Sequence, residues 1–404
     1  MSNPLEGIKT LADLTLENKR VFLRVDFNVP LDGARITDDA RIKEALPSIK
    51  HAMSQGARVI LASHLGRPKP GKHEGFSLEP CGERLAELLG VEVHMPDDCI
   101  GDSAKKVVFD LRSGQLCLLE NLRFHEEEEK DDAEFAAKLA ALADVYVNDA
   151  FGAVHRAHAS VHALPRLFQA RAAGFLLQKE IAALGQLVAA PPRPYVAILG
   201  GAKVSDKLAI LEALVEKVDT LLIGGAMANT FLAAKGCNMQ ASRVEGDKLP
   251  LARGILDRAA ARGAKVLLPT DVIVAKSLEA SEGTRAEVNA LAEGQMALDI
   301  GPNTIAAYGE AIAKAGSVFW NGPMGLFEKT PFAAGTFGVA KHMADAPGLT
   351  VVGGGDSAAA VRAAGPEIAD KMKHISTGGG AALEWIEGRK LPGIEALRGG
   401  GQNS

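Results

Sequence analysis

Cysteine, long apolar runs and an excess of positive charge are all scarce or missing in this chain of 404 residues. The four cysteines (Cys81, Cys99, Cys117 and Cys237) show no CxxC or other zinc-binding spacing, so we expect buried, reduced thiols in a cytoplasmic protein. No apolar stretch approaches the ~20 residues of a membrane span, and Met1–Thr10 does not resemble a signal peptide. The net charge of −5 argues against a nucleic-acid partner.

The length and composition favour a folded protein of two domains. Ala172–Ala190 is predicted to form one helix that ends at the proline cluster Pro191–Pro194, because proline cannot continue a helix. We therefore predict an N-terminal domain over residues 1–171, a connector helix over 172–190 and a C-terminal domain over 191–390. The acidic run Glu126–Glu129 is interpreted as a solvated face or a helix start.

Short apolar runs rich in β-branched residues alternate with amphipathic stretches such as Asp39–Ser54 and Ser205–Val215. This alternation predicts parallel sheets covered by helices on both faces, and hence an α/β fold of two Rossmann-like three-layer domains. The predicted strands are Val21–Phe27, Arg58–Ala62, Gln115–Glu120, Val145–Val147, Tyr195–Leu199, Thr220–Ile223, Lys265–Leu268, Ser317–Trp320 and Thr350–Val352.

Glycines crowd the carboxyl ends of the strands in the second half of the chain, where ligands bind in an open parallel sheet. A single glycine-rich turn is usually explained by steric needs, but five such turns at equivalent places predict a nucleotide pocket. The turns are Gly200-Gly201, Gly224-Gly225, Gly322-Pro323-Met324-Gly325, Gly353-Gly354-Gly355 and Gly378-Gly379-Gly380.

Three charged residues accompany these glycines. If a helix begins near Lys203, then Lys203 and Lys207 project from one face of its first turn, where an anion would offset the unfavourable dipole. Asp356 follows three glycines and is a candidate ligand for Mg²⁺ carried on phosphates, although it could equally cap its helix.

Basic residues gather at the strand ends of the first half. Since the carboxyl ends of parallel strands meet at one edge, they predict a site for an anion with several charges, although any one of them alone is more often a surface charge. Three histidines (His155, His158 and His162) lack a supporting carboxylate or cysteine, which argues against a metal site there. The basic residues are Arg24, Arg41, His64, Arg67, Arg123, Arg156 and His158.

These motifs together resemble the phosphoglycerate kinase family across nearly the whole chain. The segments that carry the resemblance are Arg24–Pro30, Ser63–Pro68, Glu120–His125, Asn148–Gly152, His155–His158, Gly200–Lys207, Gly224–Thr230, Asn321–Gly325, Gly353–Ser357 and Ser376–Gly380.

The resemblance implies reversible phosphoryl transfer from 1,3-bisphosphoglycerate to MgADP, giving 3-phosphoglycerate and MgATP, by direct in-line transfer after hinge-bending closure. It further implies a cytoplasmic, monomeric enzyme of glycolysis and gluconeogenesis, with residues 391–404 packed back on the first domain. Residues implied to contact the glycerate substrate are Asp26, Asn28, Arg41, His64, Arg67, Arg123 and Arg156. Residues implied in catalysis are Arg41, Lys203, Gly378 and Gly379. Residues implied at the nucleotide are Lys207, Gly224, Asn321, Glu328, Gly354, Gly355, Ser357 and Asp356, the last also holding Mg²⁺.

Two other functions use part of the same pattern. A NAD-dependent dehydrogenase also has glycine-rich strand ends, but it should show a GxGxxG fingerprint, which is missing. A non-catalytic nucleotide sensor would keep the glycines and have no use for the basic set. A carboxylate acceptor is already ionised at neutral pH, so the kinase needs no nucleophile–base pair, and none is present in these motifs.

Overall fold

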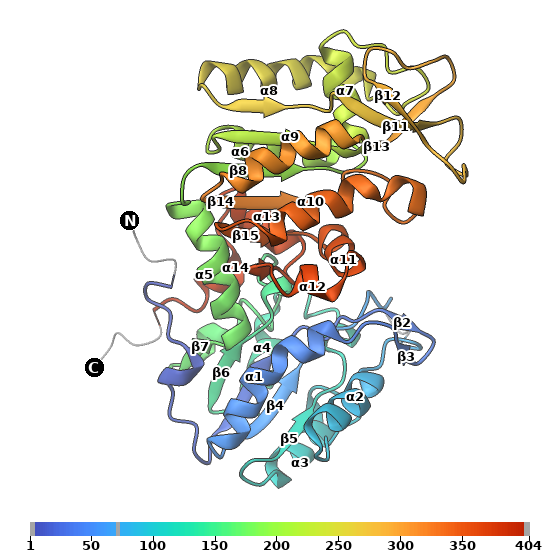
Figure 1. The fold of residues 1–404 in the computed structure, drawn as a ribbon. Helices are drawn as coiled ribbons and strands as arrows, with labels where there is room; N and C mark the ends of the chain where they lie inside the picture. Colours follow the sequence, from blue (N-terminus) through green and yellow to red (C-terminus); the bar gives the residue numbers. More distant parts are fainter. Residues whose placement is uncertain (1–4, 70–72, 400–404) are drawn as a thin grey trace. The chain divides into compact units, whose positions relative to one another are not determined.

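The chain forms two compact units, which divide between Ala182 and Ala183. The computed structural model describes residues 5–69 and 73–399 (Figure 1). The division falls inside helix α5 (Phe175–Ala189), and the segment that begins at Lys390 groups with the N-terminal unit. The final residues of the glycine-rich tail, 400–404, lie outside the described part of the chain.

The N-terminal unit is built on a parallel sheet with the strand order β5-β4-β1-β6-β7. Its strands are β1 (Arg20–Arg24), β4 (Arg58–Ala62), β5 (Leu116–Leu118), β6 (Val145–Asn148) and β7 (Arg171–Ala173), and a short hairpin is formed by β2 (Leu31–Asp32) and β3 (Arg35–Ile36). Its helices are α1 (Ala40–Ser54), α2 (Glu79–Leu89), α3 (Gly101–Asp110), α4 (Ala133–Ala140) and α14 (Pro392–Glu395), with the 3₁₀ turns η1 (Leu11–Asp13), η2 (Leu122–Phe124), η3 (Phe151–Ala153) and η4 (Leu164–Leu167).

The main core of this unit lies between the sheet and helices α1 and α2. Alternate residues of β1, such as Val21 and Leu23, pack there against Ile42 of α1 and Leu85 of α2. The intervening strand residues are buried on the other face. There the ring of Tyr146 in β6 stacks on the ring of Phe22 in β1, with 6.0 Å between the ring centroids. Both faces of the strands are therefore covered, as their continuous apolar sequences predict.

The predicted connector helix begins later than expected. Arg171–Ala173 forms β7, a parallel edge strand beside β6, and α5 starts only at Phe175. Gly174 separates the two elements, and a Cβ atom there would lie 2.3 Å from Asp149 Oδ1. Small residues such as Ala172 suit either a helix or a strand, so pairing with β6 decided the outcome.

The C-terminal segment packs on the N-terminal unit through backbone contacts and apolar side chains. Gly393 N donates to Val154 O at 2.9 Å, and Arg171 Nη2 donates to Arg398 O at 2.6 Å. Ile394 is buried, with 2 % of its surface exposed.

The C-terminal unit is built on a second parallel sheet, with the strand order β10-β9-β8-β14-β15-β16. Its strands are β8 (Tyr195–Leu199), β9 (Thr220–Ile223), β10 (Lys265–Leu267), β14 (Ser317–Asn321), β15 (Leu349–Val352) and β16 (His374–Ile375). Its helices are α6 (Leu208–Val215), α7 (Gly225–Ala234), α8 (Leu249–Ala261), α9 (Pro302–Ala313), α10 (Ala334–Ala344), α11 (Gly355–Ala363), α12 (Pro366–Ala369) and α13 (Gly380–Ile386), with the turns η5 (Ser205–Lys207), η6 (Gly246–Lys248) and η7 (Thr330–Phe332).

Helices cover both faces of this sheet. Helices α9, α10 and α11 supply Ile312, Val339 and Val361 to the core that contains Trp320 of β14. On the opposite side, α6 contacts both α8 and α13 and buries residues such as Leu211. The two Rossmann-like α/β domains predicted from sequence are thus present.

A three-stranded antiparallel sheet was not predicted. It has the order β12-β11-β13, with β11 (Asp271–Ala275), β12 (Thr284–Glu287) and β13 (Met296–Ile300). The strand β12 is largely exposed and carries charged residues, so it lacks the apolar run by which the parallel strands were recognised.

Glu128 belongs to the acidic run that was predicted to be a solvated face or a helix start, yet it is fully buried. Within the described residues, no helix is long and apolar enough to cross a membrane.

Ile394→Ala should destabilise the N-terminal unit by about 2–5 kcal/mol, because it leaves a cavity where the C-terminal segment docks. Hydrogen exchange of the β1 and β6 amides, followed by mass spectrometry, measures this loss. The control is Leu278→Ala in the other unit, since Leu278 is 51 % exposed. Equal exchange in the two variants would contradict the docking.

Candidate functional site

In the N-terminal unit, the predicted polar residues follow the carboxyl ends of adjacent strands. Asp26 and Asn28 follow β1, His64 and Arg67 follow β4, and Arg123 lies in η2 after β5. Because β5, β4, β1 and β6 are parallel neighbours, these ends share one edge of the sheet.

Arg41 and Asp26 form the central ion pair of this edge. Arg41 lies in the first turn of α1, and its Nη1 is 2.6 Å from Asp26 Oδ2. Burial of Asp26 favours the neutral acid, but the positive charges of Arg41 and Arg24, together with the Asn28 N–H that donates to Asp26 Oδ1, outweigh it and hold the pKa of Asp26 below its usual value. Arg41 is thus held at this edge of the sheet, while about a third of its side chain stays exposed.

Hydrogen bonds join the loops that follow β1, β4 and β5. Gly66 N donates to Asn28 Oδ1 at 2.9 Å, and Arg123 Nη1 donates to Gly66 O at 2.6 Å. Asn121, which was not predicted, is fully buried and donates from Nδ2 to Leu65 O. These bonds fix the backbone that carries the basic side chains.

The basic side chains are close enough to affect one another's protonation. Burial, together with the charges of Arg123, Arg24 and Arg156, lowers the pKa of His158 to about 3. Burial also lowers the pKa of Arg123, and Arg156 and Arg24 act in the same direction. This mutual repulsion shows a concentrated positive site that suits an anion.

Arg67 and Arg156 lie at the margin of the cluster. Arg67 is exposed, and among the described residues it forms no hydrogen bond or ion pair. Arg156 donates from Nε to His155 Nε2 at 3.1 Å. His162 pairs with Asp131 at 2.6 Å. His155 therefore contacts an arginine, and His162 contacts an aspartate.

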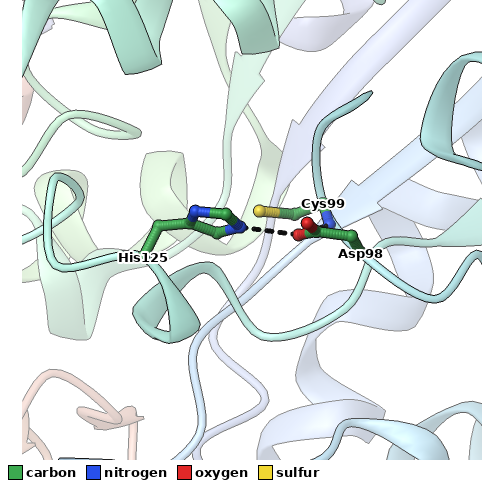
Figure 2. Close-up of side chains that lie close together, drawn as sticks. All are labelled: Asp98, Cys99 and His125. Carbon is green, nitrogen blue, oxygen red and sulfur yellow. Dashed lines mark hydrogen bonds and ion pairs between the residues drawn. The ribbon is translucent and has the colours of Figure 1, made fainter. Parts of the chain in front are cut away.

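One group elsewhere has the residue types of a metal site. Within the described residues, only Asp98, Cys99 and His125 bring three such ligand atoms within 4.8 Å of one another (Figure 2). Asp98 Oδ1 already accepts from Cys99 N at 2.6 Å and contacts His125 Nε2 at 2.7 Å. Burial and the Asp98 charge raise the pKa of the Cys99 thiol well above its usual value, so the thiol is protonated. We interpret the group as a clamp that ties the loop after η2 to the start of α3.

In the C-terminal unit, several of the predicted glycines are required by the packing of the chain itself. A Cβ atom on Gly200 would lie 2.1 Å from Pro323 O, and one on Gly322 would lie 2.2 Å from Gly200 O. Gly225 combines a φ of 66° with a Cβ position 2.5 Å from Gly201 N. The loops after β8, β9 and β14 are therefore in direct backbone contact.

Polar residues of three loops meet beside these glycines. Lys207 Nζ donates to Asn321 Oδ1, and Asn321 Nδ2 donates to Gly353 O at 2.6 Å. The buried Ser357 hydroxyl accepts from Gly322 N at 2.6 Å. Burial lowers the pKa of Lys207, and the nearby charge of Asp356 opposes the shift. The structure thus brings Lys207, Asn321, Ser357 and Asp356 together.

Asp356 is exposed in the first turn of α11 and does not cap this helix. The N-cap is Gly354, with a φ of 92°, and it receives no side-chain cap. The helix-capping alternative for Asp356 is therefore wrong. An exposed carboxylate near Lys207 is a suitable oxygen ligand for Mg²⁺ carried on phosphates.

The remaining predicted residues have less defined surroundings. Lys203 lies in an irregular loop before η5, and α6 begins at Leu208, so the expectation of one helical face for Lys203 and Lys207 was wrong. Gly379 is the N-cap of α13 with a φ of 51°, and Gly378 N donates to Ser376 Oγ. Glu328 is exposed in the turn after β14.

Comparison with known proteins decides the family. The phosphoglycerate kinase family model matches residues 11–389. The chain belongs to the phosphoglycerate kinase family. A phosphoglycerate kinase of Anaeromyxobacter sp. strain Fw109-5 is 58 % identical over 397 residues, covering 97 % of this chain and all of the relative. One from Bdellovibrio bacteriovorus is 50 % identical over 401 residues, covering 98 % and 99 %.

Solved phosphoglycerate kinase structures agree. The enzyme from Coxiella burnetii matches with a TM-score of 0.88 and 40 % identity, covering 96 % of this chain and 98 % of the other. The enzyme from Pyrococcus horikoshii OT3 matches with a TM-score of 0.85 and 36 % identity over the same shares. The chain is therefore a kinase of this family, with the predicted fold, and the dehydrogenase and sensor alternatives are set aside.

Asp299→Asn should remove a pH dependence from the C-terminal unit. Asp299 accepts from Gly335 N at 2.7 Å and from Ile300 N at 2.9 Å, yet burial raises its pKa from 3.8 to about 7. The folded chain then binds more protons than the unfolded chain between those values, so this contribution to stability is lost as the pH rises through that window. Relative to wild type, the variant should gain up to roughly 3 kcal/mol of unfolding free energy between pH 5 and 7.

Urea unfolding followed by tryptophan fluorescence measures this change, because Trp320 and Trp385 both lie in this unit. Asp345→Asn is the control for an exposed carboxylate of the same unit. A constant difference between Asp299→Asn and wild type across the pH range would contradict the assignment.

Proposed function

We propose that this chain catalyses reversible phosphoryl transfer between 1,3-bisphosphoglycerate and MgADP, giving 3-phosphoglycerate and MgATP. The observation that carries the proposal is the full-length membership of the phosphoglycerate kinase family, at 50–58 % identity to the two relatives above. The two sets of polar residues support it, because one is suited to a multiply charged anion and the other to a nucleotide.

The N-terminal unit is proposed to bind the glycerate substrate. Arginine forks match carboxylate and phosphate oxygens, and they stay charged even when their neighbours are basic. Asp26 orients Arg41 and leaves the rest of its guanidinium free for the substrate. The residues proposed to contact the substrate are Asp26, Asn28, Arg41, His64, Arg67, Arg123 and Arg156.

The C-terminal unit is proposed to bind the nucleotide, with Lys207 on its phosphates and Asp356 on the Mg²⁺ that accompanies them. Bound Mg²⁺ would neutralise charge on the phosphate oxygens. The other residues proposed at the nucleotide are Gly224, Asn321, Glu328, Gly354, Gly355 and Ser357. Lys203, Gly378 and Gly379 are proposed to act with Arg41 on the transferred phosphoryl group.

The chemistry is proposed to rest on positioning and charge neutralisation. The acceptor oxygen belongs to a carboxylate, which is ionised at neutral pH, so no side chain has to remove a proton. Hinge-bending closure, a monomeric state and a cytoplasmic location stay predictions.

Arg41→Ala should lower kcat by about 10²–10³-fold, because it removes a donor from the charge that develops during transfer. The KM for ATP should change by less than about twofold. A coupled assay with 3-phosphoglycerate and MgATP measures both, and in wild type it tests the proposed function directly.

The matched control is Arg35→Ala, which removes an arginine with a 78 % exposed side chain from the β2–β3 hairpin. Turnover by Arg41→Ala at the rate of Arg35→Ala would remove Arg41 from the catalytic set. Absence of wild-type turnover would contradict the function itself.

Gly355→Ala tests nucleotide binding without disturbing the fold. Gly355 has no positive φ, and a Cβ atom there would meet nothing within 4 Å, so the fold itself tolerates alanine. A nucleotide lying against this backbone would meet the added methyl group, and we expect KM for ATP and ADP to rise roughly tenfold, or about 1.4 kcal/mol.

Gly254→Ala in α8 is the matched control, since a Cβ atom there also meets nothing within 4 Å. Thermal unfolding should show no loss of stability in either variant. An unchanged nucleotide KM in Gly355→Ala would place the nucleotide elsewhere.

A further inference from the structure

Arg24 is a buried arginine that holds one nitrogen of the His64 ring. Its side chain is 1 % exposed, and its Nη2 lies 3.1 Å from His64 Nδ1. Its Nη1 donates to Val25 O, and its Nε donates to Ser160 Oγ at 2.8 Å. Each nitrogen of the guanidinium therefore has a partner, and the group has little freedom to turn away from His64.

Ser160 connects Arg24 to a buried carboxylate. Its hydroxyl accepts from Arg24 Nε and donates to Glu128 Oε1 at 2.5 Å, while its backbone N–H donates to Glu128 Oε2 at 2.9 Å. Ser160 and Glu128 are both fully buried. A buried charge is tolerated only when it is paired and hydrogen-bonded, so Glu128 compensates Arg24 through the serine hydroxyl.

The contact with Arg24 determines which nitrogen of His64 carries a proton. A guanidinium has only donors, so His64 Nδ1 must accept and cannot be protonated. The ring is then neutral, with its proton on Nε2. The opposite tautomer would present a lone pair from Nε2, which an anionic oxygen repels.

The charges around His64 act in the same direction. Burial lowers the pKa of His64 well below its usual value, and Arg24, Arg123 and Arg41 lower it further, while Asp26 opposes them. A neutral ring that donates from Nε2 is the form that remains useful to an anionic substrate in this basic surrounding.

We propose that Glu128 and Ser160 are positioning residues, which hold Arg24 against His64 and so fix His64 as a neutral Nε2–H donor to an anionic oxygen of the substrate. The inference rests on the proposed function for the substrate, whereas the tautomer of His64 is a property of the free protein.

The tautomer is tested first, in the full chain without ligand. Long-range ¹H–¹⁵N correlation spectra of protein labelled at histidine distinguish the two neutral tautomers and the cation, and His64→Gln assigns the His64 signals. In wild type at pH 7 we expect the neutral Nε2–H form. A cationic ring or an Nδ1–H ring would overturn the proposal.

Ser160→Ala then removes the hydroxyl that connects Arg24 to Glu128. We expect a mixture of His64 tautomers and a rise of about three- to tenfold in the KM for 3-phosphoglycerate, which is the size of one lost hydrogen bond. The KM for ATP and kcat should change by less than about twofold. The matched control is Ser317→Ala in the other unit, which also removes a buried serine hydrogen bond, to Pro192 O at 2.8 Å.

Unchanged His64 signals in Ser160→Ala, or equal KM values for 3-phosphoglycerate in Ser160→Ala and Ser317→Ala, would overturn the positioning role. If Ser160→Ala does not fold, the tautomer of His64 in wild type still tests the proposal, because a cationic or Nδ1–H ring would overturn it. A failure of the proposed function is distinguishable, because wild type would then show no turnover of 3-phosphoglycerate whatever its His64 tautomer.

Discussion

Parallel strands bring all their carboxyl ends to one edge of a sheet, and both units of this chain place their polar residues there. The covered faces of each sheet are apolar, so charged side chains on the strands and directly after them can reach solvent only at the edges of the sheet. The loops that leave such an edge must turn within a few residues and lie against one another. Gly200, Gly322 and Gly225 show the consequence, since a Cβ atom on any of them would overlap the backbone of a neighbouring loop.

The two units use this edge for different chemistry because their loops carry different side chains. In the N-terminal unit, the positive charges of the arginines repel one another and help to keep His64 neutral, and the buried carboxylates Asp26 and Glu128 offset that repulsion from within. In the C-terminal unit, the loops carry mainly glycine, with Lys207, Asn321 and Asp356 beside them. The first arrangement suits a small anion with several charges, and the second leaves backbone close to a larger ligand.

Much of this could be predicted from the order of residues. Continuous apolar runs predicted the parallel strands, and the helices α1 and α6 lie within the predicted amphipathic stretches. The exceptions have identifiable causes. The strand β12 is exposed and charged, β7 consists of small residues, and Lys203 lies in a loop because α6 begins at Leu208. The local sequence patterns of these three segments are weak, so contacts with neighbouring elements determined their secondary structure.

The sequence alone determined the fold class, the family and the residue types at each strand end, because these follow from local patterns and motifs within short segments. Only the tertiary structure decided which of those residues act on one another. Glu128 belongs to an acidic run that is predicted to be solvated, yet it is buried and reaches Arg24, 104 positions away in the chain, through Ser160. No local pattern contains such a contact, because burial and partnership depend on the packing of distant segments.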